Sequence, residues 1–460
     1  MRPLAATIEA VERVQPMRVS GVVCGVRGLI VAVEDLPLPV GTRVLIRSTS
    51  GGSPRTSEGE IIGFSGAQAV VMLLGQSVGI CAGDAVAGQQ VAQTALAGRA
   101  LLGRCVDGLG RPIDGKGRID GAIEAPLHAS PIASLRRRPI IEPMRTGVRA
   151  IDLMMPIGKG QRVGIFAGPG VGKSTLLGQI ARRSSADVNV IALVGERGRE
   201  VGEFIEHCLG EEGIKRSIVV VSTGDESPLM RVRAALSACA AAEHFRDQGA
   251  DVLLMMDSAT RFAQALRLIG LSLGEPPATR GYTPSVFAGL SQLLERAGAM
   301  SDGEDGRRGG SITGLYTILV EGDDMTEPVA DAVRGILDGH VMLSRKLAQR
   351  AHYPAIDVLD SISRVADAVS DAMHTEARRQ IVRLMAAYRG VEELVQIGAY
   401  ARGASAESDV AIEFQPRIDE LLMQQTDDVA AFEPARQSLV RLAIEAGEAI
   451  LARRRERKAA

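Results

Sequence analysis

The 460-residue sequence predicts a multidomain α/β protein with an N-terminal β-barrel, a central α/β domain on a mostly parallel sheet, and a C-terminal helical domain. Three observations predict this class. Short β-rich runs separated by Gly and Pro come first, long apolar runs alternating with helical stretches follow, and only helix-period patterns remain at the end. We place the domains at residues 1–92, 93–364 and 365–460.

The length and composition agree with several globular domains. A chain of 460 residues is too long for one ordinary hydrophobic core. The net charge of −2 provides no general affinity for polyanions, which disfavours a nucleic-acid-binding protein. The five cysteines include no CxxC pair, so their spacing supports neither a zinc site nor a disulfide framework.

Nothing in the sequence predicts a membrane span or a signal peptide. No apolar run approaches the length of about 18 to 20 residues that a spanning helix needs. Glu9 and Glu12 lie near the N-terminus, where a signal peptide would carry basic and then apolar residues. We therefore expect a cytoplasmic protein.

The N-terminal part predicts a small barrel. Residues 18–90 contain short β-rich runs such as GTRVLIRS and EGEIIGFSGAQAVVMLL, with glycine turns between them. Strands this short predict an antiparallel barrel or sandwich. The segment VDGLGRPIDGKG (106–117) predicts a turn-rich connector, and residues 136–143 predict a linker into the next unit.

The central part predicts a parallel sheet covered on both faces, because its strands are continuously apolar and alternate with helices. The predicted strands are residues 162–168, 188–196, 217–223 and 251–257, and helices are predicted over 173–184 and 229–247. From about 365 the strand signal ends, and helical periodicity at 375–398 and 419–425 predicts an all-helical domain.

A phosphate-binding loop is the strongest chemical signal. The string A-G-P-G-V-G-K-S (167–174) follows a predicted strand and opens a predicted helix, which is the context that the motif requires. Its glycines let backbone N–H groups approach phosphate oxygens, and the helix N-terminus adds a partial positive charge. We assign nucleotide binding to Gly168, Pro169, Gly170, Val171, Gly172, Lys173, Ser174 and Thr175.

Two acidic residues follow later strands. Asp257 ends the strand DVLLMMD, where its carboxylate can reach the water shell of a magnesium ion whose other protein ligand is Ser174. Glu196 lies in GERGRE, where a carboxylate near the γ-phosphate could polarise the attacking water, with Arg197 and Glu200 fixing its orientation. By spacing alone, a solvated charged loop explains GERGRE equally well.

A fourth stretch, PAIDVLDSISR (354–364), ends in Arg364, which closes a Ser-rich turn where the helical region begins. Without further information, an arginine in such a place is read as a surface charge or a helix cap.

These four stretches together resemble the catalytic ATPases of the rotary ATP synthase superfamily, and PAIDVLDSIS matches the superfamily's Pro-Ser/Ala-aliphatic-Asp-x3-Ser-x-Ser signature. Residues 145–162, 257–290 and 309–340 resemble more closely the type III protein-export ATPases, which drive export through flagellar basal bodies and virulence injectisomes. The resemblance runs from about residue 100 to 400 and implies an N-terminal β-barrel, a RecA-like nucleotide domain and a C-terminal helical domain.

The resemblance also implies an ATP phosphohydrolase with ATP and Mg²⁺ in its site. Lys173 and Ser174 would hold phosphate and metal, Asp257 would serve the magnesium shell with Arg261 close by, and Glu196 would activate water. Arg364 would be a finger inserted into the neighbouring subunit's site, which makes a homohexameric ring the expected active state. Tyr353 would stack on the adenine. We also count Arg197 among the catalytic residues.

Two positions depart from the superfamily pattern. Ala167 replaces the first glycine of the loop, and its methyl group is small enough for the loop to tolerate the change. Tyr316 stands where synthase β-subunits carry Gln, which favours the export branch.

Three other functions remain open beside an export ATPase. The chain could be the catalytic subunit of a rotary ion-translocating ATP synthase, although residues 257–340 favour export. It could be a non-catalytic nucleotide-binding ring subunit, but a Gln would then be expected at Glu196. The third is a hexameric RNA translocase. The chain has only 8 Phe, 5 Tyr and no Trp, which provides few side chains for base stacking, so we expect no nucleic-acid partner.

The resemblance implies further partners and a location. The partners would be a peripheral-stalk regulator, a central-stalk protein, the export gate membrane proteins, and export chaperones with their substrates, at the inner membrane. Overall similarity favours a flagellar system over a virulence injectisome, and no single residue decides between them. The basic end ARRRERKAA (452–460) is read as a solvated helix end, with contact to acidic partners or lipid head groups as the alternative.

Overall fold

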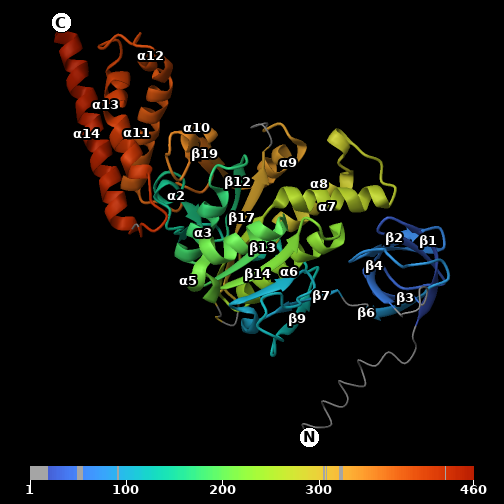
Figure 1. Cartoon of the computed structure of the whole chain (residues 1–460). Coiled ribbons are helices and arrows are strands. Elements are labelled where there is room, and N and C mark those ends of the chain that lie inside the picture. The colour runs from blue at the N-terminus through green and yellow to red at the C-terminus, as the bar shows by residue number, and fades with distance from the viewer. Residues whose placement is uncertain are drawn as a thin grey trace.

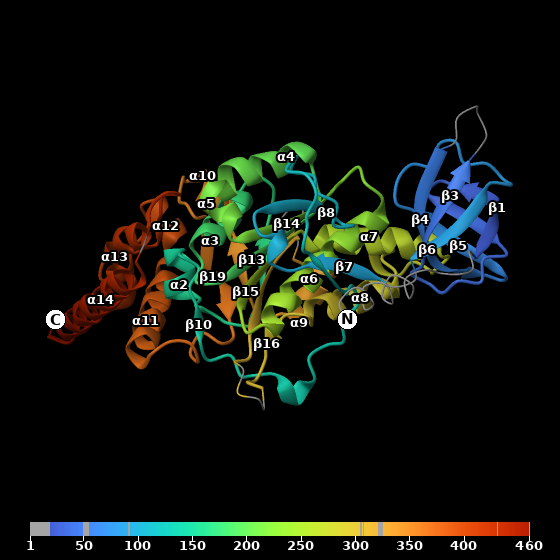
Figure 2. The same ribbon diagram turned by 90° about the horizontal axis from the view of Figure 1, so that it is seen from below.

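The computed structural model describes residues 19–48, 55–90, 93–303, 306, 308–320, 325–429 and 431–459. A barrel lies at one end of the molecule, a sheet domain in the middle, and a group of helices at the other end (Figures 1 and 2). The predicted fold class is confirmed. Glu9 and Glu12 lie outside the described residues, as do residues 321–324 of the export-type segment 309–340.

The N-terminal strands form a closed barrel, which decides between the barrel and the sandwich that the sequence allowed. The strand order is β1-β2-β5-β4-β3-β6, and every neighbouring pair is antiparallel. Alternate side chains such as Val31 and Val33 point inward and are completely buried. The strands are β1 Ser20–Arg27, β2 Ile30–Glu34, β3 Arg43–Ser48, β4 Arg55–Ser65, β5 Gln68–Leu73 and β6 Ala85–Gln90.

The central sheet has the strand order β19-β18-β12-β17-β15-β13-β14-β8, with β16 paired to β17. Its pairs are parallel except β18–β19 and β16–β17. The strands are β8 Arg104–Asp107, β12 Arg162–Ala167, β13 Val188–Glu196, β14 Ser217–Thr223, β15 Asp251–Asp257, β16 Gly298–Ala299, β17 Ser311–Leu319, β18 Gly339–Leu343 and β19 Ile356–Ser363.

Helices cover both faces of this sheet, as its continuously apolar strands predict. Neighbouring residues on one strand enter different cores: Ile165 packs in the core with α2, α3 and the C-terminal helices, whereas Phe166 packs with α6, α7, α8 and α9. The helices of this domain are α2 Arg149–Met154, α3 Lys173–Arg183, α4 Gly198–Glu203, α5 Gly210–Lys215, α6 Pro228–Asp247, α7 Ala259–Ser272, α8 Pro284–Leu294, α9 Pro328–Ile336 and α10 Arg345–Gln349.

Two structural details differ from the sequence expectations. The first residues of the expected connector 106–117 belong to β8, an edge strand of the sheet. The Ser-rich stretch before Arg364 is not a turn but the antiparallel strand β19, because Ile356 and Val358 alternate with polar residues and bury one side of this edge strand. Two short strand pairs, β7 Thr94–Ala97 with β9 Ile123–Pro126 and β10 Pro143–Met144 with β11 Ile157–Gly158, complete the connections.

A buried ion pair joins the barrel to the sheet domain. Arg233 of α6 donates to Glu60 of β4 at 2.7 Å, and both side chains are less than a tenth exposed. Met72 and Leu74 of the barrel pack beside it against Leu229 and Met230. Because a buried charge without its partner is costly, this pair fixes where the barrel is attached.

The C-terminal region is helical, with α11 Ala372–Arg389, α12 Glu392–Gln396, α13 Ala406–Leu422 and α14 Phe432–Ala459. The helix expected over 375–398 is interrupted at residues 390–391, and the one expected over 419–425 ends at Leu422. The basic residues near the end of the chain form the largely exposed last turns of α14. Within the described part of the chain, every helix is too short or too polar to span a lipid bilayer.

Candidate active site

The phosphate-binding loop connects β12 to α3. Gly170 and Gly172 adopt positive φ angles of 76° and 89°, a conformation that side-chain-bearing residues rarely adopt, and Lys173 is the first residue of α3. The loop therefore brings backbone N–H groups and the positive end of the helix dipole to one place.

Ala167 is the last residue of β12 and is 2% exposed. It pairs with Leu319 of β17, and its carbonyl oxygen accepts from the backbone N–H of Val320 at 3.1 Å. The methyl group thus lies in the sheet core, where a small side chain fits, which explains why the departure from glycine is accommodated.

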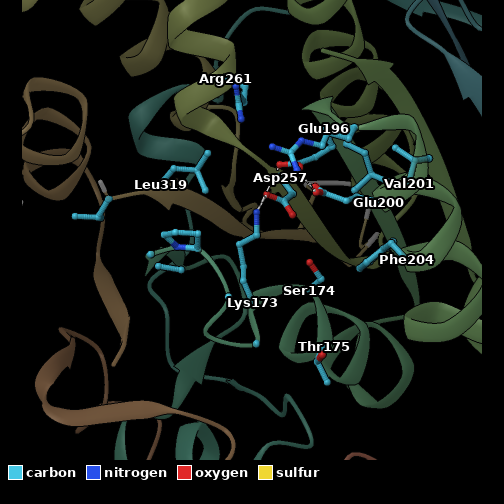
Figure 3. A pocket seen from close by; sticks show the side chains of 18 residues that line it. Lys173, Ser174, Thr175, Glu196, Glu200, Val201, Phe204, Asp257, Arg261 and Leu319 are labelled. Atoms are coloured by element: carbon cyan, nitrogen blue, oxygen red, sulfur yellow. Dashed lines mark hydrogen bonds and ion pairs between the residues drawn. The ribbon is translucent and has the colours of Figure 1, made fainter. Parts of the chain in front are cut away.

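A cavity of about 520 Å³ opens beside the loop at the carboxyl ends of β12, β13, β15 and β17 (Figure 3). Parallel strands bring their carboxyl ends to one edge, so residues far apart in sequence meet there. The cavity is lined by Gly168, Pro169, Gly170, Gly172, Lys173, Ser174, Thr175, Glu196, Arg197, Asp257 and Arg261 among others. Val171, within the loop, packs in the core and lines the second cavity described below.

Lys173 bridges two carboxylates in this cavity. Its Nζ lies 2.5 Å from Oδ1 of Asp257 and 3.6 Å from Oε1 of Glu196. Thr317 of β17 donates its hydroxyl to the same Asp257 oxygen at 2.7 Å, which fixes the carboxylate on the buried side. All three charged side chains are less than 15% exposed, so their charges are weakly screened.

The electrostatics of the cavity perturb both Glu196 and Lys173. Burial and the neighbouring Asp257 charge raise the pKa of Glu196 to about 7, although Lys173 opposes the shift. Burial acts to lower the pKa of Lys173, but the charges of Asp257 and Glu196 outweigh it and the net shift is upward. The site therefore keeps a charged ammonium beside a carboxyl group that exchanges its proton near neutral pH.

Arg197 and Glu200 lie at the entrance of the cavity. The guanidinium of Arg197 contacts Glu200 at 3.4 Å, and the Arg197 side chain is 79% exposed. Glu200 also contributes to raising the pKa of Glu196, by a hydrogen bond and by its charge. Glu200 thus interacts with both Arg197 and Glu196. The sequence analysis had named Glu200 and Arg197 as two residues that could orient Glu196.

Tyr353 lies on the other side of the loop, in a second cavity of about 340 Å³. Its ring is close to Gly172, where a Cβ atom would lie 3.6 Å from the Tyr353 Cε1 atom. The same cavity is lined by Gln424, Gln425 and Thr426, which follow α13. The sequence analysis missed these three residues, because no motif connects them to a loop about 250 positions earlier.

Arg364 is not brought into either cavity. It follows β19 and is exposed, and its backbone N–H donates to the carbonyl oxygen of Asp338 at 3.0 Å. Within the described residues, its guanidinium has no hydrogen bond or ion pair. One chain alone therefore presents Arg364 to solvent.

Comparisons with known proteins agree with this architecture. Residues 147–363 match the model of the ATP synthase alpha/beta family, nucleotide-binding domain, and residues 370–441 match that of the T3SS EscN ATPase C-terminal domain. The flagellum-specific ATP synthase of Bacillus subtilis is 47% identical over 435 residues, covering 95% of this chain and 98% of the relative. The type 3 secretion system ATPase of Xanthomonas euvesicatoria is 48% identical, covering 90% and 91%.

Among solved structures, the assembled ATPase EscN from the enteropathogenic E. coli type III secretion system superposes with a TM-score of 0.83 at 40% identity. The match covers 92% of this chain and 100% of EscN. EscN in complex with its central stalk EscO gives a TM-score of 0.82 at 39% identity.

The chain belongs to the family of type III protein-export ATPases. The match of its C-terminal helices to the EscN domain distinguishes this export ATPase from a rotary synthase subunit, which was the nearest alternative. Tyr316, whose identity suggested the same branch, is completely buried on β17 and does not line the 520 Å³ cavity. Burial raises the pKa of its phenol, which keeps the side chain neutral.

Proposed function

We propose that this export ATPase hydrolyses Mg-ATP in the 520 Å³ cavity and works as a homohexameric ring that energises flagellar export. The observation that carries the proposal is the close grouping of Lys173, Glu196 and Asp257 beside the phosphate-binding loop. We further propose the domain limits 1–92, 93–364 and 365–460, which the ends of the barrel at Gln90 and of β19 at Ser363 support.

The loop and Lys173 would bind the phosphates. Lys173 now contacts two carboxylates, and a bound triphosphate would offer its ammonium a third anionic partner at the same edge of the sheet. Arg261 lines the same cavity and adds a second positive charge. These cations would stabilise the charge that develops on the transferred phosphoryl group.

The residues present fit a magnesium ion held together with nucleotide. Ser174 and Asp257 offer the hard oxygen ligands that Mg²⁺ prefers, and both line the cavity. No group of three or more His, Cys, Asp or Glu in the described residues forms a metal cage, which suits an ion that takes most ligands from phosphate and water. Bound magnesium would neutralise phosphate charge.

Glu196 would orient the attacking water and accept its proton. Its buried Oε1 atom has an ion pair with Lys173 at 3.6 Å but no hydrogen-bond partner in the described structure, so it can still accept a hydrogen bond. A pKa near 7 makes the carboxylate basic enough to take a proton while about half of these groups are still ionised at neutral pH. Arg197 would hold the carboxylate of Glu200, and Glu200 would in turn hold Glu196 in position.

The neighbouring subunit would supply Arg364 to this site. Arg364 is exposed and lines neither of the two cavities described above, which is the placement that an inserted finger requires. The related EscN is described as an assembled ATPase and also in complex with a central stalk, which supports a ring and a stalk partner here. Tyr353 would stack on the adenine in the 340 Å³ cavity.

The flagellar assignment can be tested in cells of the source bacterium. Deleting the gene should abolish motility and the release of hook protein, and the wild-type gene should restore both. Lys173→Ala should fail to restore them, whereas Lys215→Ala, a matched change at an exposed lysine that pairs with Glu212, should succeed. Normal motility in the deletion strain together with loss of injectisome secretion would overturn the flagellar assignment and leave the ATPase assignment intact.

A further inference from the structure

The second cavity contains a buried amide that joins its two walls. The Gln424 side chain is 5% exposed. Its Oε1 atom accepts from the backbone N–H of Arg149 at 2.8 Å, and its Nε2 atom donates to the carbonyl oxygens of Gly147 at 3.0 Å and Asp428 at 2.9 Å. Its backbone N–H donates to the carbonyl oxygen of Tyr353 at 2.9 Å. Gln424 thus contacts the turn before α2, the first residue of that helix and Tyr353 at once.

The turn before α2, to which this amide is bonded, is closely packed. The turn before α2 is held by the buried carboxylate of Asp152, which accepts from the N–H groups of Thr146 at 2.8 Å and Gly147 at 3.0 Å. Gly147 has a φ angle of 75°, and a Cβ atom there would lie 2.4 Å from Cβ of Arg183. A closely packed turn with satisfied polar groups offers a fixed point to which Gln424 is attached.

Helix α3 holds the same linker from its far end. Arg183, the last residue of α3, donates to the carbonyl oxygens of Asp428 at 2.5 Å and Thr426 at 2.7 Å. The first residue of α3 is Lys173 in the phosphate site. The linker between α13 and α14 is therefore connected to the nucleotide domain at two points, the turn before α2 and the end of α3.

A purely structural role is the competing explanation, since a buried, fully bonded amide also joins helices in proteins without any ligand. Two features point beyond it. Gln424 lines the cavity together with Tyr353, Gln425 and Thr426, and its own backbone N–H bonds to Tyr353. In the part of the chain that the structure describes, none of the hydrogen bonds of Gln424 reaches a residue that lines the phosphate cavity, so its influence can be confined to one side of the loop.

We infer that Gln424 is a positioning residue for the nucleotide base: it holds Tyr353 and the 424–426 wall at the spacing that a base needs, without acting on the phosphates. The inference rests on the proposed base site at Tyr353. It predicts that Gln424 sets the affinity for adenosine nucleotides and not the affinity for their phosphate chain.

The test compares the binding of ATP and of inorganic tripolyphosphate to the full-length protein by calorimetry. Gln424→Met keeps the length of the side chain but removes every side-chain hydrogen bond, so ATP affinity should fall about tenfold while tripolyphosphate affinity stays unchanged. Gln424→Glu keeps the acceptor for Arg149 but sets a carboxylate against two carbonyl oxygens, so its loss should be at least as large. Gln396→Met, at an exposed glutamine that ends α12 and lines neither cavity, is the matched control and should leave both affinities unchanged.

A double-mutant cycle separates positioning from general destabilisation. If Gln424 acts through Tyr353, the ATP losses of Tyr353→Ala and Gln424→Met should be clearly less than additive. Equal losses for ATP and tripolyphosphate, or no loss for ATP in either Gln424 variant, would overturn the inference. If Tyr353→Ala leaves ATP affinity unchanged, the proposed base site is wrong and the inference fails with it. If Tyr353→Ala weakens ATP binding and the Gln424 variants do not, only the role of Gln424 fails.

Discussion

The cavity beside the phosphate-binding loop and the end of β19 differ in how they treat charged side chains: the first buries and pairs them, and the second exposes one. The cavity gathers Lys173, Glu196 and Asp257 from three elements of one chain, and their charges are buried and paired. The end of β19 presents Arg364 to solvent without a side-chain partner in the described residues. The proposed hydrolytic site, which uses both regions, would therefore be divided between subunits, because one chain does not bring them together.

The largest effect should come from the exposed region. Replacing Arg364 by Ala should lower turnover on the order of 10³-fold to 10⁵-fold, because the charge of the transition state would lose its finger from the neighbour. ATP binding should change little, since Arg364 does not line its own chain's cavities. Steady-state hydrolysis and calorimetry measure the two quantities. Arg334→Ala, at another exposed arginine, is the control and should retain wild-type turnover.

The next effect should come from the cavity. Glu196→Gln should bind ATP normally and lower turnover on the order of 10²-fold to 10⁴-fold, because the amide does not accept the proton of the attacking water. Single-turnover hydrolysis of bound ATP measures this step directly. Turnover close to that of the wild type would remove Glu196 from the role of base.

Acid should slow the same step. In the proposed role as base, Glu196 acts in its ionised form, and its pKa of about 7 means that this form is lost as the pH falls through 7. Turnover at saturating ATP should therefore drop toward a tenfold loss per pH unit well below that value. A profile that stays flat down to pH 5, where an unperturbed glutamate is still largely ionised, would contradict the raised pKa.

The smallest of these effects should come from the base side of the loop. Tyr353→Ala should weaken ATP binding by roughly tenfold to a hundredfold, because stacking of a base on an aromatic ring contributes about 1–3 kcal/mol. The rate of hydrolysis at saturating ATP should change much less. Tyr353→Phe keeps the ring and serves as the matched control. A large loss of turnover with unchanged ATP affinity would show that the ring acts on the chemical step.

Much of the fold could be predicted because its signals are local. The barrel strands, the apolar strands of the sheet and the loop before α3 are each written in a short stretch of sequence. The meeting of Glu196 and Asp257 at one edge follows from the parallel arrangement of β13 and β15, although their roles remain predictions. The strand β19 was missed, because an edge strand with one buried side contains polar residues that resemble a turn.

The base side of the loop could not be predicted in the same way. Gln424 is a single amide after α13 with no motif around it, and only the packing of the C-terminal helices against α2 and α3 brings it to Tyr353. The raised pKa of Glu196 is likewise a product of burial and neighbouring charge in the folded chain. Such properties depend on tertiary contacts that a linear pattern does not record.

The most direct test of the divided site mixes two inactive proteins. Lys173→Ala lacks the ammonium of the phosphate site, and Arg364→Ala lacks the finger, so each homogeneous ring should be nearly inactive. In mixed rings, an Arg364→Ala subunit keeps a complete cavity and receives the finger of a Lys173→Ala neighbour, so ATP hydrolysis should reappear and peak at intermediate mixing ratios. Hydrolysis that stays at the level of the separate variants at every ratio, in rings shown to exchange subunits, would contradict the account.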